Sequence, residues 1–337
     1  MSLTARHLLS LFVLNVSLAS AGIGQLHTPE ESKAQLHDKM ALEKVAQLRE
    51  MAMAGNAEAQ YLLGMVYIKG TEVARDYDQA VKWQQAAAAQ GLKDAQFALG
   101  YLYEQGYGVE KDYTLAFQLY RAAAQSGHAE AENNLASMYQ HGRGVAKSVN
   151  QALTLYRISA EHGNPVAQCN LASLYFLGQD VLQNYNEAVI WFRMAANAGD
   201  PVAQNNLAYM YYKGRGVAVD YGEAFRLTRL AAEQGYALAE TDLGYLYEQG
   251  KGAPLDYVAA YVWYSAGKVG GDARAISRLK ALSQLMGQEQ IAEAKSRTLS
   301  KVAETRETPK VPNHESDSSV RNSPAFHEAG NLATSQK

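Results

Sequence analysis

The sequence predicts an all-α fold, an α-solenoid built from tandem two-helix repeats. A glycine recurs every 36 residues over most of the chain. The apolar residues between these glycines recur at helical spacings, and no segment shows the two-residue period of a strand. Because a unit of this length cannot bury its own apolar face, successive units must stack into one continuous array. The recurring glycines, called marker glycines below, are Gly55, Gly91, Gly127, Gly163, Gly199, Gly235 and Gly271.

The first helix of each repeat is predicted by residues that hardly vary among the six full repeats. With the marker glycine as position 1, position 5 is always Ala, position 9 is always Leu and position 13 is always Tyr. Successive spacings of four residues place these side chains on one face of a helix. Small residues at positions 5 and 10 allow a neighbouring helix to approach closely. Position 16 is always glycine, which predicts a left-handed C-cap.

The second helix of each repeat is predicted to begin after position 22, where every occupant favours an N-cap. These occupants are Asp76, Asp112, Ser148, Asn184, Asp220 and Asp256. Four repeats carry Gln or Glu three residues later, which is the pattern of a capping box. These residues are Gln79, Gln151, Glu187 and Glu223. The next marker glycine ends the helix, so each repeat consists of helix, loop, helix and turn.

The chain divides into five predicted regions. Residues 1–21 form a signal peptide, 22–54 an N-terminal capping helix, 55–270 the six repeats, 271–303 a partial repeat with a C-terminal capping helix, and 304–337 a disordered tail. Thr28 and Glu31 form a capping-box start for a helix that runs towards Met53. Residues 288 to about 300 predict a closing helix with a polar outer face. The tail is rich in Ser, Pro, Asn and charge, which favours disorder.

The first 25 residues have the layout of a secretory signal peptide. Arg6 precedes an apolar run from Leu8 to Leu18, which is too short to span a bilayer as a helix. Residues 19–21 (Ala-Ser-Ala) fit a cleavage site between small residues. We therefore expect an exported protein, periplasmic or secreted, after cleavage near Ala21. The alternative interpretation is a hydrophobic first helix of the array.

The composition argues against several classes of partner. The chain has 34 acidic and 31 basic residues and no block of Lys or Arg, so we expect no nucleic-acid partner and no attachment to anionic lipid. No second apolar stretch approaches the roughly 20 residues of a membrane span. Cys169 is the single cysteine and cannot form an intramolecular disulfide. Its thiol is either exposed enough for a mixed disulfide or part of the packing.

The repeats resemble the Sel1-like repeat, a relative of the tetratricopeptide repeat. The segment that begins at Ala95, AQFALGYLYEQGYGVEKDYTLAFQLYRAAAQSG, follows the family pattern almost throughout, and the likeness covers about residues 55–300. The resemblance implies a right-handed superhelix that acts as a protein-interaction scaffold, with its first helices lining the concave side. It implies no common substrate and no common chemistry, so function carries over only as a class.

Candidate partner-binding residues lie at positions 8 and 11 of the first helix, away from its packing face. An Asn side chain both donates and accepts hydrogen bonds, so a row of Asn residues could hold an extended peptide backbone. Tyr adds apolar area with a polar tip. In the alternative interpretation, Asn at this position hydrogen-bonds the neighbouring repeat or a helix end. The candidates are Asn134, Asn170, Asn206, Asp242, Tyr101, Tyr209 and Tyr245.

No catalytic or metal-binding motif stands out, so we expect a non-enzymatic protein with no cofactor and no metal. The G-x-G loops follow helices, whereas dinucleotide-binding loops follow strands. His128, His141 and His162 lie at element ends of one repeat, where we expect solvated side chains. Ser277 and Lys280 match the S-x-x-K motif of penicillin-recognising enzymes, without its companion motifs. The leading hypothesis is thus an exported adaptor in envelope biology or host interaction. The alternative is a peptidoglycan-related binder, or a hydrolase-like activity of the penicillin-recognising type.

Overall fold

The computed structural model describes residues 43–307, with side chains up to residue 299, and every regular element in that range is a helix. The first helices of the repeats are α3 (Ala57–Lys69), α5 (Lys93–Gln105), α7 (Ala129–His141), α9 (Pro165–Leu177), α11 (Pro201–Lys213), α13 (Ala237–Gln249) and α15 (Ala273–Leu285). The second helices are α4 (Tyr77–Ala89), α6 (Tyr113–Gln125), α8 (Val149–Glu161), α10 (Tyr185–Asn197), α12 (Tyr221–Glu233) and α14 (Tyr257–Val269). A final helix, α16 (Gln288–Glu307), follows.

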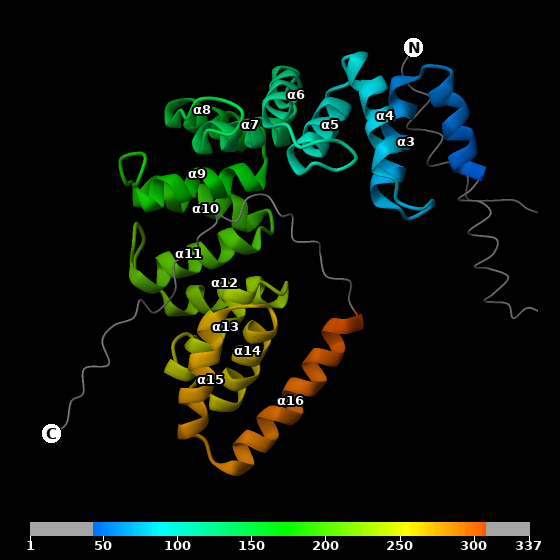
Figure 1. Ribbon diagram of the computed structural model, residues 1–337. Coiled ribbons are helices and arrows are strands. Elements are labelled where there is room, and N and C mark those ends of the chain that lie inside the picture. Colours follow the sequence, from blue (N-terminus) through cyan, green and yellow to red (C-terminus); the bar gives the residue numbers. More distant parts are fainter. Residues whose placement is uncertain (1–42, 308–337) are drawn as a thin grey trace, which may run out of the picture.

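The helices pack in chain order as one curved solenoid, as predicted (Figure 1). Each first helix packs against the second helix of its own repeat, and each second helix packs against the first helix of the next repeat. The helix pair α3/α4 lies near one end of the described array, and α15 and α16 lie at the other (Figure 1). Repeats 1 to 6 below begin at Gly55, Gly91, Gly127, Gly163, Gly199 and Gly235.

The structure describes part of each predicted terminal region. Residues 43–53 are helical, which is the last part of the predicted N-terminal capping helix. The predicted signal peptide and the predicted start of this helix at Thr28 lie outside the described residues. At the other end, α16 packs against α14 and continues to Glu307. The helix therefore extends past the predicted boundary at residue 304, because Glu304 and Arg306 are good helix formers.

Both classes of predicted glycine cap are present. The first helix of each of the six full repeats ends at position 16 on a left-handed glycine. The φ of these glycines ranges from 61° at Gly250 to 76° at Gly106. The marker glycines also have positive φ, from 71° at Gly127 to 95° at Gly271. A residue with a Cβ is strained in this region, so glycine recurs at both places.

The N-caps of the second helices are confirmed, but the predicted capping box is wrong. Each position-22 side chain accepts a hydrogen bond from the first turn of its helix. The N–H of the same residue donates to the carbonyl of the position-13 tyrosine, as in Asp220 to Tyr211 at 3.0 Å. This bond closes the loop and uses the donor that a capping box needs. The Glu223 carboxylate instead pairs with Arg226 at 2.7 Å.

The second glycine of each G-x-G loop allows close contact between repeats. A Cβ on Gly144 would lie 2.1 Å from the Tyr113 carbonyl oxygen, and one on Gly252 would lie 2.1 Å from the Tyr221 carbonyl oxygen. Both tyrosines are the first helical residue of the preceding repeat's second helix. These loops therefore serve packing, since their backbone rests directly on the neighbouring repeat.

The core confirms the pairing of small and large residues within each repeat. Tyr120 and Tyr264 are fully buried on the second helices. A Cβ on Gly100 would lie 2.9 Å from the Tyr120 ring, and one on Gly244 would lie 2.7 Å from the Tyr264 ring. The rings thus fill the space that a missing side chain leaves at position 10. Burial and the nearby Glu104, which accepts from the Tyr120 hydroxyl at 2.7 Å, raise the pKa of that hydroxyl well above its ordinary value.

Candidate functional site

Polar side chains of the first helices link successive repeats through buried hydrogen bonds. The Asn170 amide at position 8 donates to the Asn133 carbonyl oxygen at position 7 of the preceding repeat, at 2.9 Å. Two repeats later, Asn205 at position 7 donates to the carboxylate of Asp242 at position 8, at 3.0 Å. The same two positions are joined in both cases. Position 7 of repeat 4 is Cys169, which is completely buried, so its thiol is not exposed for a mixed disulfide.

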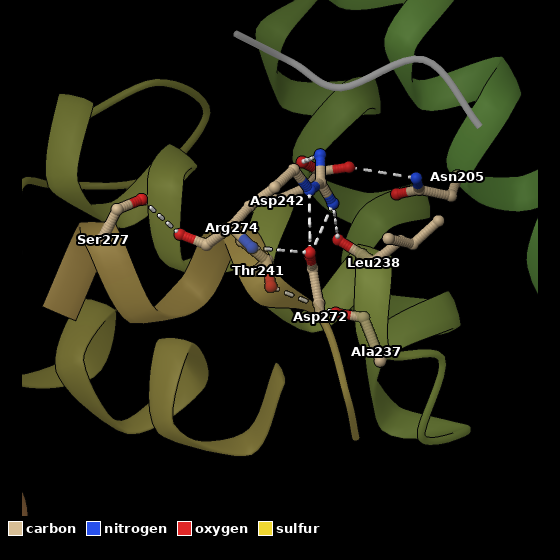
Figure 2. A network of polar contacts seen from close by, with 8 residues as sticks. All are labelled: Asn205, Ala237, Leu238, Thr241, Asp242, Asp272, Arg274 and Ser277. Atoms are coloured by element: carbon tan, nitrogen blue, oxygen red, sulfur yellow. Dashed lines mark hydrogen bonds and ion pairs between the residues drawn. The ribbon is translucent and has the colours of Figure 1, made fainter. Parts of the chain in front are cut away.

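The polar contacts end in a buried ion cluster that holds the partial seventh repeat (Figure 2). The Arg274 guanidinium lies between two carboxylates, 2.8 Å from Asp272 and 3.2 Å from Asp242. It also donates to the Leu238 carbonyl at 3.2 Å. Burial alone would raise the pKa of the Asp272 carboxyl, but hydrogen bonds from Arg274 and Thr241 outweigh it and lower that pKa. The cluster therefore keeps Asp272 charged and α15 fixed on α13.

The structure divides the seven predicted partner-binding residues into two groups. Asn170, Asn206, Asp242 and Tyr209 are buried, with exposed fractions of 7%, 3%, 1% and 0%. Tyr101, Asn134 and Tyr245 are partly exposed. Asn170 and Asp242 bond neighbouring repeats, as the alternative interpretation expects. Partner binding by any of the seven stays a prediction, and the partly exposed residues are the ones that a partner can reach directly.

A cation sits in an aromatic cage at the boundary of repeats 4 and 5. The Arg215 guanidinium carbon is 5.7 Å from the ring centroid of Phe176, 5.6 Å from that of Tyr185 and 5.3 Å from that of Tyr209. Phe176 and Tyr209 also contact each other edge to face, with centroids 5.9 Å apart. The cage, called cage 4/5 below, consists of Arg215, Phe176, Tyr185 and Tyr209.

The next boundary repeats this arrangement with the same positions. Lys251 Nζ is 4.7 Å from the ring centroid of Tyr212 and 4.6 Å from that of Tyr221. It also donates to the Tyr212 hydroxyl at 3.0 Å, and Tyr245 lies edge-on to Tyr212 with centroids 6.2 Å apart. These four residues form cage 5/6. In both cages, positions 14 and 23 of one repeat and positions 11 and 17 of the next supply the side chains.

Two further cations make the cages continuous. Lys213 Nζ lies 5.8 Å from the Tyr209 ring centroid and 5.5 Å from that of Tyr212, so it bridges the cages. The Arg278 guanidinium lies 5.0 Å from the Tyr245 ring centroid. We call the two cages with Lys213 and Arg278 the cation–aromatic ladder. Sequence reasoning missed it, although the Tyr or Phe at positions 11, 14 and 23 and the cation at position 17 were available as a signal.

The histidines of repeat 3 correct one expectation. His128 has a side chain only 10% exposed, because its ring stacks on Phe97 with centroids 4.5 Å apart. Its Nδ1 accepts from the Ala131 N–H and caps α7. His162 is about half exposed and lies 2.8 Å from the buried Glu132 carboxylate. His128 therefore serves capping and packing, and the described residues contain no group of three or more potential metal ligands.

The S-x-x-K residues lie on the surface of α15. Ser277 and Lys280 are both exposed, and the Ser277 hydroxyl donates to the Arg274 carbonyl of its own helix at 2.9 Å (Figure 2). A nucleophilic serine needs a base within hydrogen-bond reach, and no hydrogen bond joins Ser277 to Lys280. Nothing in this geometry supports the penicillin-recognising alternative. Separately, no helix between residues 43 and 307 is both long and apolar enough to cross a membrane.

Comparisons with known proteins agree with this architecture. The chain is 33% identical to a protective antigen of uropathogenic Escherichia coli strains that displays an SLR fold, with a TM-score of 0.66 over 77% of this chain and 56% of that one. It is 31% identical to a Sel1 repeat protein from Oxalobacter formigenes, with a TM-score of 0.59 over 68% of this chain and 96% of that one. The chain thus spans only about half of the antigen's length. No curated protein matches it.

The sequence profile of the Sel1 repeat matches six consecutive segments, and each match begins at the first residue of a first helix. The matched segments are residues 57–92, 93–128, 129–164, 165–200, 201–236 and 237–267. They cover more than half of the chain and coincide with the helix pairs that the structure shows. This protein therefore belongs to the Sel1 repeat family.

Proposed function

We propose that the protein is an exported, non-catalytic scaffold that binds a protein or peptide partner on the concave, first-helix side of the solenoid. The observation that carries the proposal is the contrast between fixed and variable positions of the first helix. Ala, Leu and Tyr recur at the packing positions of all six repeats, whereas position 8 is Leu, Ala, Asn or Asp and position 11 is Met, Ser or Tyr. Among the variable side chains, Tyr101, Asn134 and Tyr245 are partly exposed. Such amphipathic side chains suit a protein interface.

Export is supported by the N-terminal sequence and by similarity. The first 25 residues follow the order of a signal peptide. One similar protein is described as a protective antigen of uropathogenic Escherichia coli. N-terminal sequencing of the protein recovered from cells tests this part. A major form that begins near Gly22 is expected, and a major form that begins at Met1 or Ser2 would contradict export.

The binding side is tested by substituting its accessible residues. Tyr101→Ala, Asn134→Ala and Tyr245→Ala together should reduce crosslinked partner recovered from envelope fractions, as identified by mass spectrometry. Leu182→Ala with Met194→Ala is the control, because these exposed residues lie in the loop after α9 and on α10, away from the first helices. Undiminished recovery with the triple variant would disprove the binding side. Tight binding of purified peptidoglycan, or turnover of β-lactams, would favour the alternative function.

A further inference from the structure

The cation–aromatic ladder lies on one stretch of the solenoid, from repeat 4 to the partial seventh repeat. We propose that it binds an acidic segment of the partner protein that carries several carboxylate side chains. This inference rests on the proposed function, because it names the chemistry of a partner for the same scaffold. It concerns the ladder cations rather than the predicted Asn residues.

The two best-placed cations are held by rings and have no acidic partner among the described residues. The Arg215 guanidinium lies over three rings, and it makes no hydrogen bond or ion pair with any residue between 43 and 299. The same is true of the Lys213 ammonium group, which belongs to an exposed residue. A guanidinium has five N–H donors, and no residue between 43 and 299 accepts a side-chain hydrogen bond from Arg215. A carboxylate can accept two of them side by side.

The charge of the ladder is strongly one-sided. It carries four cations, and one of them, Arg278, is paired with the Glu248 carboxylate. That carboxylate already pairs with Arg278 at 3.7 Å and accepts a hydrogen bond from the Tyr264 hydroxyl. The chain as a whole is slightly acidic, with a net charge of −3, so this local excess of positive charge is not a general property of the surface. A ligand with negative charge complements it.

The positive charges of the ladder follow one another along the solenoid. Cage 4/5 and cage 5/6 use the same positions in successive repeats, and Lys213 contacts one ring of each cage. Several Asp or Glu side chains of one segment can therefore meet Arg215, Lys213 and Lys251.

A peptide fits the ladder better than a nucleic acid. Single-stranded nucleic acids bind aromatic platforms by stacking bases on open ring faces. Here the ring faces of Tyr185, Tyr209 and Tyr212 already hold Arg215, Lys213 or Lys251. The rings therefore fix the positions of the cations, and the cations bind the negative charges of the peptide. Such pre-ordered cations lose little side-chain entropy on binding.

The experiment uses the mature full chain and fluorescently labelled synthetic peptides. One peptide has several Asp residues with Gly and Ser between, and a second has Asn in place of each Asp. We expect the first to bind at least about tenfold more tightly than the second at low salt. Combined Arg215→Gln and Lys251→Gln should weaken its binding at least about tenfold and flatten its salt dependence.

The matched control is Arg226→Gln, which removes one exposed cation on α12 that lies outside the ladder. Arg215→Lys retains charge but loses the planar fork, so its affinity should be intermediate. Circular dichroism confirms that the variants fold. Equal binding by the wild type and by the Arg215→Gln and Lys251→Gln variant would overturn the proposal. So would equal binding of the Asp and Asn peptides, or tighter binding of single-stranded DNA or anionic vesicles than of the Asp peptide.

The two proposals can fail separately. If the partner captured from envelope fractions binds the Arg215→Gln and Lys251→Gln variant as well as the wild type, the acidic-segment inference is wrong and the scaffold function stands. If the Asp peptide binds through the ladder but no partner depends on the first-helix side, the ladder is confirmed as an acidic-peptide site and the proposed binding side is wrong.

Discussion

At the boundary of repeats 1 and 2, position 17 is Tyr107, whose ring stacks on Tyr77 with centroids 4.8 Å apart. At the boundary of repeats 4 and 5, position 17 is Arg215, which lies over three rings. The loop before each residue is the same, since both follow a left-handed glycine that ends the first helix, Gly106 or Gly214. One loop side chain therefore decides whether a boundary presents stacked rings or a positive charge, without a change in the fold.

The polar residues of the first helices differ between the two regions in a similar way. In repeats 3 to 7, buried Asn and Asp residues bond across the repeats and end in the Asp242–Arg274–Asp272 cluster. In repeat 2, the corresponding position 8 is the buried Ala98. The position-8 bond is therefore missing between repeats 1 and 2, since an Ala side chain can neither donate nor accept a hydrogen bond. The C-terminal region adds buried polar bonds that fix the orientation of the repeats bearing the ladder.

The largest expected effect tests the backbone geometry that the two regions share. Gly108→Ala and Gly252→Ala should each cost about 3–5 kcal/mol in the free energy of unfolding. In both cases a Cβ at positive φ would meet a carbonyl oxygen of the preceding repeat, at 2.5 Å for Gly108 and 2.1 Å for Gly252. Urea unfolding followed by circular dichroism measures the change.

The control for these glycines is Gly127→Ala, where nothing lies within 4 Å of the added Cβ. Only the left-handed conformation then opposes the substitution, which costs about 1–2 kcal/mol. Similar losses at Gly108, Gly252 and Gly127 would show that the loop glycines are needed for conformation alone. The close contact between repeats would then make no separate contribution to the free energy of unfolding.

The second prediction concerns a cluster that only the C-terminal region has. Arg274→Ala should destabilise the protein by about 3 kcal/mol at neutral pH, because it leaves Asp242 and Asp272 buried without their cation. Asn133→Ala, which removes a neutral inter-repeat bond, should cost about 1 kcal/mol. Chemical unfolding at several pH values compares the two variants.

The pH dependence of this loss has a defined sign. The lowered pKa of Asp272 means that its contribution is complete above the ordinary carboxyl value of about 3.9 and is lost as the pH falls through the lowered value. Protonation also removes the uncompensated charge in the Arg274→Ala variant. The difference between wild type and Arg274→Ala should therefore shrink below about pH 4. A difference that grows on acidification would contradict this account of the cluster.

The sequence was sufficient for the helices but not for the ladder. The helix ends depend on neighbours within the same repeat, so Gly106 and Asp220 could be assigned from their positions. The cages combine two helices of one repeat with a first helix and a loop of the next, and no single repeat contains the pattern. Tyr209 was expected to be available to a partner because its position faces away from the packing side. It is buried, since Phe176 and Arg215 of neighbouring elements lie against its ring.

A third prediction exchanges the two kinds of boundary. Arg215→Tyr should add a fourth ring to cage 4/5, so that position 17 carries a ring as it does with Tyr107 between repeats 1 and 2. The variant should bind the Asp peptide at least about tenfold more weakly than the wild type. The free energy of unfolding should change by less than about 1 kcal/mol, because ring contacts replace a cation–ring contact of similar strength. Fluorescence titration and urea unfolding give the two quantities.

The reciprocal variant, Tyr107→Arg, serves as the control for Arg215→Tyr. It should leave stability within the same limit and add a cation beside Tyr77 and Tyr101, which lie near Tyr107 in the native boundary. A loss of stability well above about 2 kcal/mol in either variant would show that position 17 is fixed by packing. The comparison between the boundaries would then fail.

The smallest expected effect concerns a polar bond that varies between repeats. Position 6 bonds position 36 in repeats 1, 3 and 5, through Gln60 with Gln90, Glu132 with His162 and Gln204 with Gln234. The repeat-3 bond alone contains ionisable groups. Glu132→Gln with His162→Gln should recreate the neutral pair and change stability by less than about 1 kcal/mol, since His162 is about half exposed.

The single variants make this last comparison decisive. The buried, ionised Glu132 carboxylate can only accept hydrogen bonds, and His162→Ala removes its hydrogen-bond partner. This variant should therefore lose more free energy of unfolding than the double variant does. A double-mutant cycle from unfolding data separates the pair's interaction from the effects of the two sites. If the double variant is destabilised as much as His162→Ala, two Gln residues do not form the bond in repeat 3. The residues at positions 6 and 36 would then not be interchangeable among repeats. The Gln pairs of repeats 1 and 5 would depend on local packing that repeat 3 lacks.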